Sequence, residues 1–412
     1  MSTKIIMSLY FCFVYLPNFY EIQAHLCKVM KLFATLAKIR EEMKAEREIA
    51  GIVLPFATGT AVFIYAGSAA PAISAPVLLS MTVILLGLLL YTRNHPANHI
   101  PTWTIAILCM ASCGGLTALT DSMLSVSAQS QTSWIVSAAQ NFGENMQNAI
   151  DSIPFRNEST GLMIKALLTG ERSGIPKEIT SAFRASGASH ILALSGLHLG
   201  IIYGIVNFIT RCLGNTRKAK IARSLILVSL CGFYTIATGA GASIVRAFIF
   251  ILIGECARLS GRPTGLRKVM MAALLIHLSI SPSSIKDVGF QLSYAAIAGI
   301  AFVFPWLQGF WPGNRHEDAA LTRCTRWIWE SAAMSISCQI TTGPLAYIYF
   351  GTFPTQFILT NMIALPLTGI IIPMALITLA ACSLGWEIQI LINGTEWLVT
   401  LLCGSLDLLS TM

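Results

Sequence analysis

The sequence predicts an all-α, polytopic α-helical membrane protein with about 10–11 transmembrane helices, some of them broken or re-entrant. Hydrophobic residues make up 55% of the 412 residues, and charged residues only 11%. The mean hydropathy is +0.68. Apolar runs recur at roughly the 20-residue length that a helix needs to cross a bilayer. This composition excludes an ordinary soluble domain.

Charge and cysteine content narrow the function classes further. The net charge of +8 is explained first by topology, because Lys and Arg gather in the cytoplasmic loops of membrane proteins. It is also compatible with a polyanionic partner. The 11 cysteines are scattered, at spacings of neither a zinc site nor a disulfide framework. We therefore expect no metal site and no cofactor.

The first part of the chain divides into three predicted regions. Residues 1–48 form an N-terminal interfacial or cytoplasmic segment, because 28–48 alternate apolar and charged residues as a surface helix does. It stays open whether residues 1–30 are expressed. Three transmembrane helices follow within 49–120, near 50–68, 75–91 and 102–120.

Residues 121–160 form an external amphipathic connection. Its apolar residues recur every three or four positions, which predicts a helix ended by Pro154. We expect this helix to lie at the outer membrane–water boundary. The apolar residues are Trp134, Ile135, Ala138, Phe142, Met146, Ile150 and Ile153.

The stretch from Gly161 to Gly200 opens a long membrane core, 161–412. A helix over 158–168 should stop at Gly170, since glycine is the usual C-terminal stop. Pro176 suits the first turn of a second short helix, which Gly187 ends.

Next, Ser189 is a plausible N-cap for a membrane helix that runs to about Thr210. Gly196 and Gly200 would let another backbone approach this helix.

The rest of the core alternates spans with basic loops. Loop 211–223 holds five basic residues and loop 258–268 holds four, without an acidic residue in either. Counting crossings from a cytoplasmic segment 28–48 puts these two loops and 312–326 inside and 121–188 outside, as the positive-inside rule requires. We expect the spans near 224–240, 243–257, 269–281, 287–306, 331–350, 356–382 and 386–406.

His190, Ser195 and His198 lie in the first half of the predicted helix 189–210. Polar groups at membrane depth mark a pathway or a site by default. Ser195 and His198 are three apart, so they share a helix face. This arrangement is unfavourable for a serine nucleophile with a histidine base, and no orienting acid is evident. Interhelical hydrogen bonds and a polar pore wall stay open as the alternatives.

Arg246 is the most costly of the polar residues in later apolar runs. It needs a partner, either Asp287 or a backbone carbonyl at a broken helix. A paired packing residue and a contact with a phosphate group of a polyanionic partner both stay open. The further polar residues are Gln291, Ser293, Gln339 and Asn361, and with Gly343, Pro344 and Pro366 they indicate helices broken around a central path.

A cluster of basic residues marks the predicted outer hairpin. Such a cluster suits the phosphates of a polyanion, but it also suits a solvated helix surface beside Glu171 and Glu178. Both interpretations stay open. The cluster consists of Lys165, Arg172, Lys177 and Arg184.

Four segments resemble the ComEC competence proteins, which carry single-stranded DNA through the inner membrane. The segments occur in the same order as in that family and with similar spacing. They are ALLTGERSGIPKEITSAFRASGASHILALSGLHLG at 166–200, GASIVRAFIF at 241–250, DVGFQLSYAAIAGI at 287–300, and SCQITTGPLAYIYFGTFPTQFILTNMIALPLTGIIIP at 337–373. This resemblance adds weight to the interpretation of Ser195 and His198 as a polar pore wall.

Two departures from that family limit what the resemblance implies. Full-length members insert an OB-fold-like domain before the core, but roughly 40 residues separate the third predicted helix from Gly161, which is too few. Members also often end in a metallo-β-lactamase-like domain with a His-rich metal motif, and no such motif precedes Met412. We therefore expect a channel and not an enzyme, with no catalytic residue.

The resemblance implies a multi-pass protein of the bacterial inner membrane that passes single-stranded DNA during natural transformation. Its partners would be single-stranded DNA, membrane lipids and other competence proteins that supply nuclease and motor activity. Self-association into a homo-oligomer stays open. The alternative function is a secondary transporter for a small anionic solute, and an intramembrane hydrolase is a third hypothesis.

The predicted topology can be tested at loop 211–223, which we expect to be cytoplasmic. A cysteine placed at Asn215 should resist a membrane-impermeant thiol reagent in intact cells and react after the cells are opened. Rapid labelling of intact cells would overturn the topology.

Overall fold

A computed structural model describes residues 46–65, 80–85, 102–124, 134–261, 265–311, 320–351 and 356–411. The predicted segment 28–48 and the predicted span 75–91 lie largely outside these ranges. The chain divides into two units, Met1–Ile52 and Val53–Met412. Of the first unit only residues 46–52 are described, as the start of a helix. All secondary structure in the described ranges is helical, which confirms the predicted fold class.

A close crossing joins the helix Glu46–Tyr65 to α4 (Thr102–Leu124). A Cβ on Gly59 would lie 1.8 Å from the carbonyl oxygen of Ala111, and one on Gly114 would lie 2.0 Å from that of Phe56. Thr60 adds a hydrogen bond from its Oγ1 to the Gly114 carbonyl, at 3.2 Å. Small residues permit this contact, as they do at membrane helix interfaces generally.

The predicted amphipathic helix is confirmed as α5 (Trp134–Asp151), which ends three residues before Pro154. Met146 and Ile150 are buried on one face, and Trp134 is exposed. The helix lies against α10 (Arg217–Ala237), where the rings of Phe142 and Phe233 are 5.4 Å apart. Its position at the outer membrane boundary stays a prediction.

Two short helices follow, α6 (Glu158–Thr169) and α7 (Lys177–Ala185). The Asn157 side chain caps α6 by accepting the backbone N–H of Ser159. Gly170 ends α6 with a φ of 81°, and its N–H donates to the Ala166 carbonyl. The predicted glycine stop is therefore confirmed, since this backbone conformation is cheap only for glycine.

The predicted continuous helix over 189–210 is wrong. The chain forms α8 (Ser189–Leu192), passes through extended residues, and starts again as α9 (Gly196–Ile209). Ser189 does not cap a long helix, because the cap position of α8 is Ala188, which makes no side-chain bond. The cap of the membrane helix is Ser195 instead.

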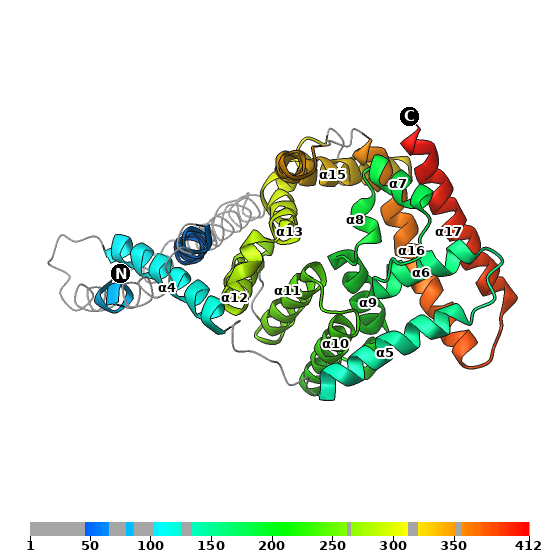
Figure 1. Cartoon of the computed structure of the whole chain (residues 1–412), viewed down its shortest axis with the longest axis horizontal. Coiled ribbons are helices and arrows are strands. Elements are labelled where there is room, and N and C mark those ends of the chain that lie inside the picture. The colour runs from blue at the N-terminus through cyan, green and yellow to red at the C-terminus, as the bar shows by residue number, and fades with distance from the viewer. Residues whose placement is uncertain are drawn as a thin grey trace, which may run out of the picture. The chain divides into compact units, whose positions relative to one another are not determined.

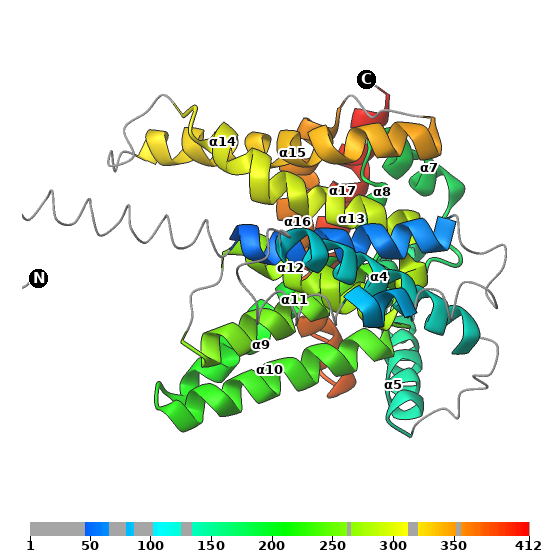
Figure 2. The ribbon, with the colours of Figure 1, turned by 90° about the vertical axis from the view of Figure 1, so that its left-hand side faces the viewer.

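Helices α10 and α11 (Ala242–Leu259) are joined by residues 238–241, which confirms the predicted short glycine-rich joint. Figure 2 shows α10 running alongside α9, with which it is in contact. Next come α12 (Leu266–Ile280), the 3-10 turn Pro282–Lys286 and α13 (Val288–Ala298). A π-helical turn, Gly299–Val303, connects α13 to α14 (Phe304–Gln308).

The last three helices are α15 (Ala320–Phe350), α16 (Phe357–Ser383) and α17 (Gln389–Ser410). We expected Pro344 and Pro366 to mark broken helices, and this expectation is wrong. Each proline lies inside a helix that continues past it. A proline removes one backbone N–H, but membrane helices accommodate the freed carbonyl through neighbouring groups and local adjustments.

Five helices in the described ranges are long and apolar enough to cross a membrane. They support a polytopic membrane protein, while the predicted total of about 10–11 stays a prediction because part of the chain is not described. A shorter apolar helical stretch covers Ala106–Ala118. The five are Glu46–Tyr65, Gly196–Leu213, Arg217–Ala237, Val288–Gln308 and Phe357–Ser383.

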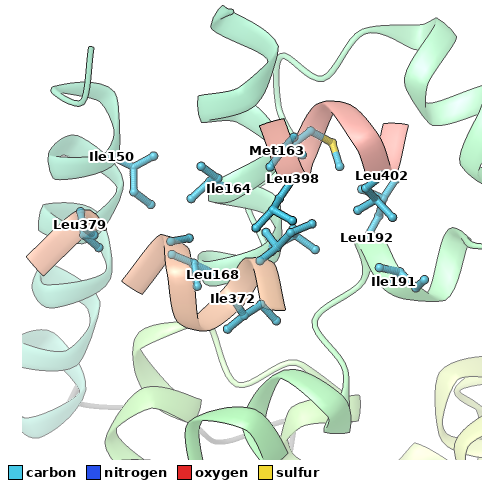
Figure 3. Close-up of a cluster of buried hydrophobic side chains, with 14 of the residues drawn as sticks. Ile150, Met163, Ile164, Leu168, Ile191, Leu192, Ile372, Leu379, Leu398 and Leu402 are labelled. Carbon is cyan, nitrogen blue, oxygen red and sulfur yellow. The ribbon is translucent and has the colours of Figure 1, made fainter. Parts of the chain in front are cut away.

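The largest apolar core is built around α6 and α8. Met163, Ile164 and Leu192 pack there against α16 and α17, as Figure 3 shows. In Figure 1, α6, α16 and α17 lie side by side, in agreement with their contacts. Hydrogen bonds reinforce this core from two other helices. The hydroxyl of Tyr234 donates to the Leu168 carbonyl at 2.5 Å, and that of Thr360 donates to the Ser186 carbonyl at 2.8 Å.

The close crossing at Gly59 predicts that two glycine-to-alanine substitutions change the stability of the protein in opposite directions. Gly59→Ala should destabilise the protein by about 1–3 kcal/mol, because the added methyl overlaps the Ala111 backbone. Gly204→Ala on α9 is the matched control, with nothing within 4 Å of its Cβ position. Alanine favours a helix over glycine by about 1 kcal/mol, so this control should keep or raise stability. Equal thermal midpoints in detergent would contradict the close crossing.

Candidate functional site

The break before α9 is held by Ser195 and His198. Ser195 is extended, with φ −122° and ψ 172°, and its Oγ accepts the N–H of Leu197 at 3.3 Å. The N–H of Ser195 in turn donates to His198 Nδ1 at 3.2 Å. These reciprocal bonds form a capping box, which satisfies backbone groups that would otherwise be orphaned inside the membrane.

The same pair bears on the hydrolase hypothesis. Ser195 Oγ lies 3.0 Å from His198 Nδ1, within hydrogen-bond distance. However, that nitrogen already accepts a backbone N–H, which leaves the ring proton on Nε2. Nε2 is buried without a hydrogen-bond partner, where a catalytic dyad would need an orienting acid. The arrangement therefore supports a helix cap that points one unpartnered N–H into the protein interior.

The two glycines beside His198 behave differently from each other. A Cβ on Gly196 would lie 3.4 Å from the Cβ of Ala247 on α11, so α9 begins against α11 one residue from Arg246. Gly200 has nothing within 4 Å of its Cβ position, so the expected close approach there is wrong.

Arg246 is almost fully buried, with 1% of its surface exposed. Its Nη2 donates to the carbonyl of Gly289 at 2.7 Å and to Ser243 Oγ at 2.9 Å. Of the two partners that the sequence left open, the structure therefore shows the backbone carbonyl. Asp287 instead caps α13, accepting the N–H groups of Gly289 and Phe290.

Gln291 joins three helices near the same end of α13. Its Nε2 donates to the Ile285 carbonyl at 2.9 Å and to the Tyr65 hydroxyl at 3.3 Å. Its Oε1 accepts from the Tyr349 hydroxyl at 2.7 Å. Ser293 is half-buried on the same helix. Arg246 and Gln291 thus meet the same first turns of α13, and α11 connects them to the start of α9.

Gln339 and Asn361 form a second group, between α15 and α16. Asn361 Nδ2 donates to Ser335 Oγ at 3.3 Å, while its Oδ1 is buried without a partner. Gln339 lines an open groove of about 410 Å³ together with Pro344 and Phe357. These two residues lie on different helices from the residues around Arg246.

The four basic residues of the predicted hairpin cluster have different surroundings in the structure. Lys165 forms an ion pair with Asp151 at 2.7 Å. Arg172, Lys177 and Arg184 are exposed, as is His190, whose Nδ1 lies 3.1 Å from the Gly187 carbonyl.

A negative charge lies within the same hairpin. Hydrogen bonds from the Ser173 side chain and backbone hold the pKa of Glu171 below its ordinary value. This carboxylate therefore stays charged and opposes the binding of a polyanion at the hairpin.

Two sets of buried polar residues lie outside the channel-lining and DNA-binding residues that the sequence predicted. The first surrounds Glu255 on α11, which accepts from Tyr203 at 2.6 Å, from Ser224 at 2.5 Å and from Arg258. The second consists of His277 and Tyr294, which lie beside Phe290 and each keep a buried atom without a partner. The sequence also offers Phe183, Tyr203, Phe290 and Tyr294 as candidate stacking platforms for DNA bases. In the structure, Phe183 is in the apolar core and Tyr203 donates a hydrogen bond to Glu255.

Comparisons with known proteins agree with this architecture. Residues 167–412 match the family described as Competence protein. ComE operon protein 3 of Bacillus subtilis is 31% identical over 141 residues, which are 34% of this chain and 17% of that protein. Competence protein ComA of Neisseria gonorrhoeae is 24% identical over 227 residues, 54% of this chain and 30% of that protein.

A third relative, Recombination protein 2 of Haemophilus influenzae, is 23% identical over 228 residues, 52% of this chain and 28% of that protein. The matched stretches span between 17% and 30% of the length of these relatives. No solved structure matches the chain. The family match covers more than half of the chain, including every helix from α7 onward, so this chain belongs to the Competence protein family.

Proposed function

We propose that this chain forms the path by which single-stranded DNA crosses the bacterial inner membrane during natural transformation. Family membership and the names of its relatives, Competence protein ComA and Recombination protein 2, support a role in DNA uptake. The observation that carries the finer proposal is a set of buried N–H groups without partners on adjoining helices. These are His198 Nε2 on α9 and Arg246 Nε and Nη1 on α11.

Such donors are rare in a membrane protein, because a polar group in an apolar interior is costly unless it is hydrogen-bonded. A strand of DNA carries one phosphate per nucleotide, so a path lined by donors shields it from lipid. Binding at each position must stay weak enough for the strand to move on. Nuclease and motor activity would come from other competence proteins, while lipids and further copies of this chain would surround the path.

The enclosure of these donors favours a second candidate. Each of the unpartnered atoms has almost no exposed surface, so a wide continuous path is closed in this conformation. A transporter for a small anion needs only such a closed site between helices. The two candidates differ in substrate size. Passage of a long strand requires α9, α11 and α13 to separate, whereas a small anion does not.

Uptake of labelled single strands by cells tests the polar path at His198. Gln is the ordinary partner in a capping box, so His198→Gln should keep the cap and most of the uptake. His198→Leu removes the interior N–H and should lower uptake about tenfold, the effect of losing one hydrogen bond. Both variants should reach the membrane at the wild-type level. Wild-type uptake by a well-inserted His198→Leu protein would reduce this residue to packing.

We also expect the purified chain not to cut DNA with zinc or manganese. Within the described ranges, no group of three His, Cys, Asp or Glu side chains is placed to hold a metal ion. The measurement is the integrity of labelled DNA after incubation, with added nuclease as the positive control. Metal-dependent cleavage that follows the chain through several purification steps would show that it is an enzyme.

A further inference from the structure

Three neighbouring helices place polar side chains around the ring of Phe290. Arg246 comes from α11, His277 from α12 and Tyr294 from α13, and these helices lie side by side in Figure 1 in agreement with their contacts. The guanidinium carbon of Arg246 lies 5.9 Å from the centre of the Phe290 ring. The rings of His277 and Tyr294 lie 5.0 Å and 4.6 Å from it.

Each of the three polar side chains keeps an atom without a hydrogen-bond partner. These atoms are Arg246 Nε and Nη1, His277 Nδ1 and the Tyr294 hydroxyl. Arg246 and His277 are buried, with 1% and 5% of their surface exposed. Buried polar groups are nearly always paired, and a charged group without an anion is the costliest exception. Several such atoms around one ring therefore indicate a site for a missing partner.

The charge of that partner follows from the donors. Arginine is always charged and has only donors, and its unpartnered Nε and Nη1 lie on different edges of the planar guanidinium, on either side of the occupied Nη2. The charge of Asp287 acts on Arg246 from a distance, but its carboxylate caps the first turn of α13 and makes no direct ion pair with the guanidinium. The partner must therefore be an anion that accepts several hydrogen bonds.

The three polar side chains come from three different helices around one ring. Donors that approach from several sides suit a tetrahedral oxyanion better than a flat carboxylate. We propose that Arg246, His277 and Tyr294 form a binding site for a phosphate or phosphodiester group.

This site deepens the proposed function and rests on it only for the claim that a DNA backbone is the natural source of the phosphate. A lipid headgroup and free phosphate carry the same chemistry. The enclosed atoms also imply that the anion enters only when α12 and α13 move apart. Occupancy of the site would then favour the more open arrangement of these helices.

The experiment uses the purified full chain in neutral lipid nanodiscs and measures its thermal midpoint with three probes. The probes are inorganic phosphate, a thymidine dinucleotide with one phosphodiester, and phosphatidylglycerol mixed into the disc. A ligand that binds only the folded state raises the midpoint by mass action. We expect phosphate and the dinucleotide to raise it in the wild-type chain. A rise with phosphatidylglycerol alone would assign the site to a headgroup, and no rise with any probe would overturn the proposal.

Tyr294→Phe is the discriminating variant, because it removes the hydroxyl and keeps the ring. An orphan hydroxyl contributes nothing to the ligand-free protein, so this variant should be at least as stable without ligand. Its affinity for the responding probe should fall about tenfold, the effect of losing a hydrogen bond to a charged group. Tyr347→Phe is the matched control, since Tyr347 is 62% exposed on α15. Unchanged probe affinity in Tyr294→Phe would contradict the site.

Binding by the purified chain requires no passage of DNA, so the two proposals can fail separately. If the chain binds phosphate but supports no uptake in cells, the anion site is supported and the proposed function is contradicted. If the chain supports uptake but no probe changes its thermal midpoint, only the anion site is contradicted.

Discussion

The structure depends on one constraint, that backbone groups at helix ends inside an apolar interior must find hydrogen-bond partners. The chain meets it with side chains from the helix itself or from a neighbour. Ser195 and His198 close the start of α9, and Asp287 closes that of α13. At the opposite ends, Tyr234 binds the Leu168 carbonyl and Thr360 binds that of Ser186. The last two bonds satisfy carbonyls at the ends of the short helices α6 and α7, which end against the apolar core.

The two buried charged residues of α11 differ in how completely they are hydrogen-bonded. Glu255 has Tyr203, Ser224 and Arg258 as partners, so its role is to hold α9, α10 and α11 together. Arg246, on the same helix, binds only through Nη2 and leaves its other two nitrogens unpartnered. A fully paired buried charge is structural, whereas an incompletely paired one is available to a ligand. This contrast is the reason for placing function at Arg246.

Local signals predicted the elements whose causes are local. The glycine stop at Gly170, the amphipathic helix α5 and the short joint before α11 all follow from patterns within a few residues. The break before α9 was missed because Ser195 and Gly196 were interpreted as a polar face and a packing residue within one span, whereas Ser195 is the cap of a new helix. Pro366 in α16 was misjudged because tertiary neighbours decide whether a helix tolerates it. His277 was missed because it lies in an apolar run, and only the packing of three helices brings it and Tyr294 to Phe290.

Crosslinking of DNA in transit tests the central claim most directly. A photoreactive phenylalanine replaces Tyr294 on α13, or replaces exposed Tyr347 on α15 as the matched aromatic control. Cells carrying each variant take up labelled single strands and are then illuminated. Our account predicts strand adducts at position 294 and none at position 347. Efficient uptake with no adduct at 294, or with equal adducts at both positions, would contradict a path that passes the polar side chains around Arg246.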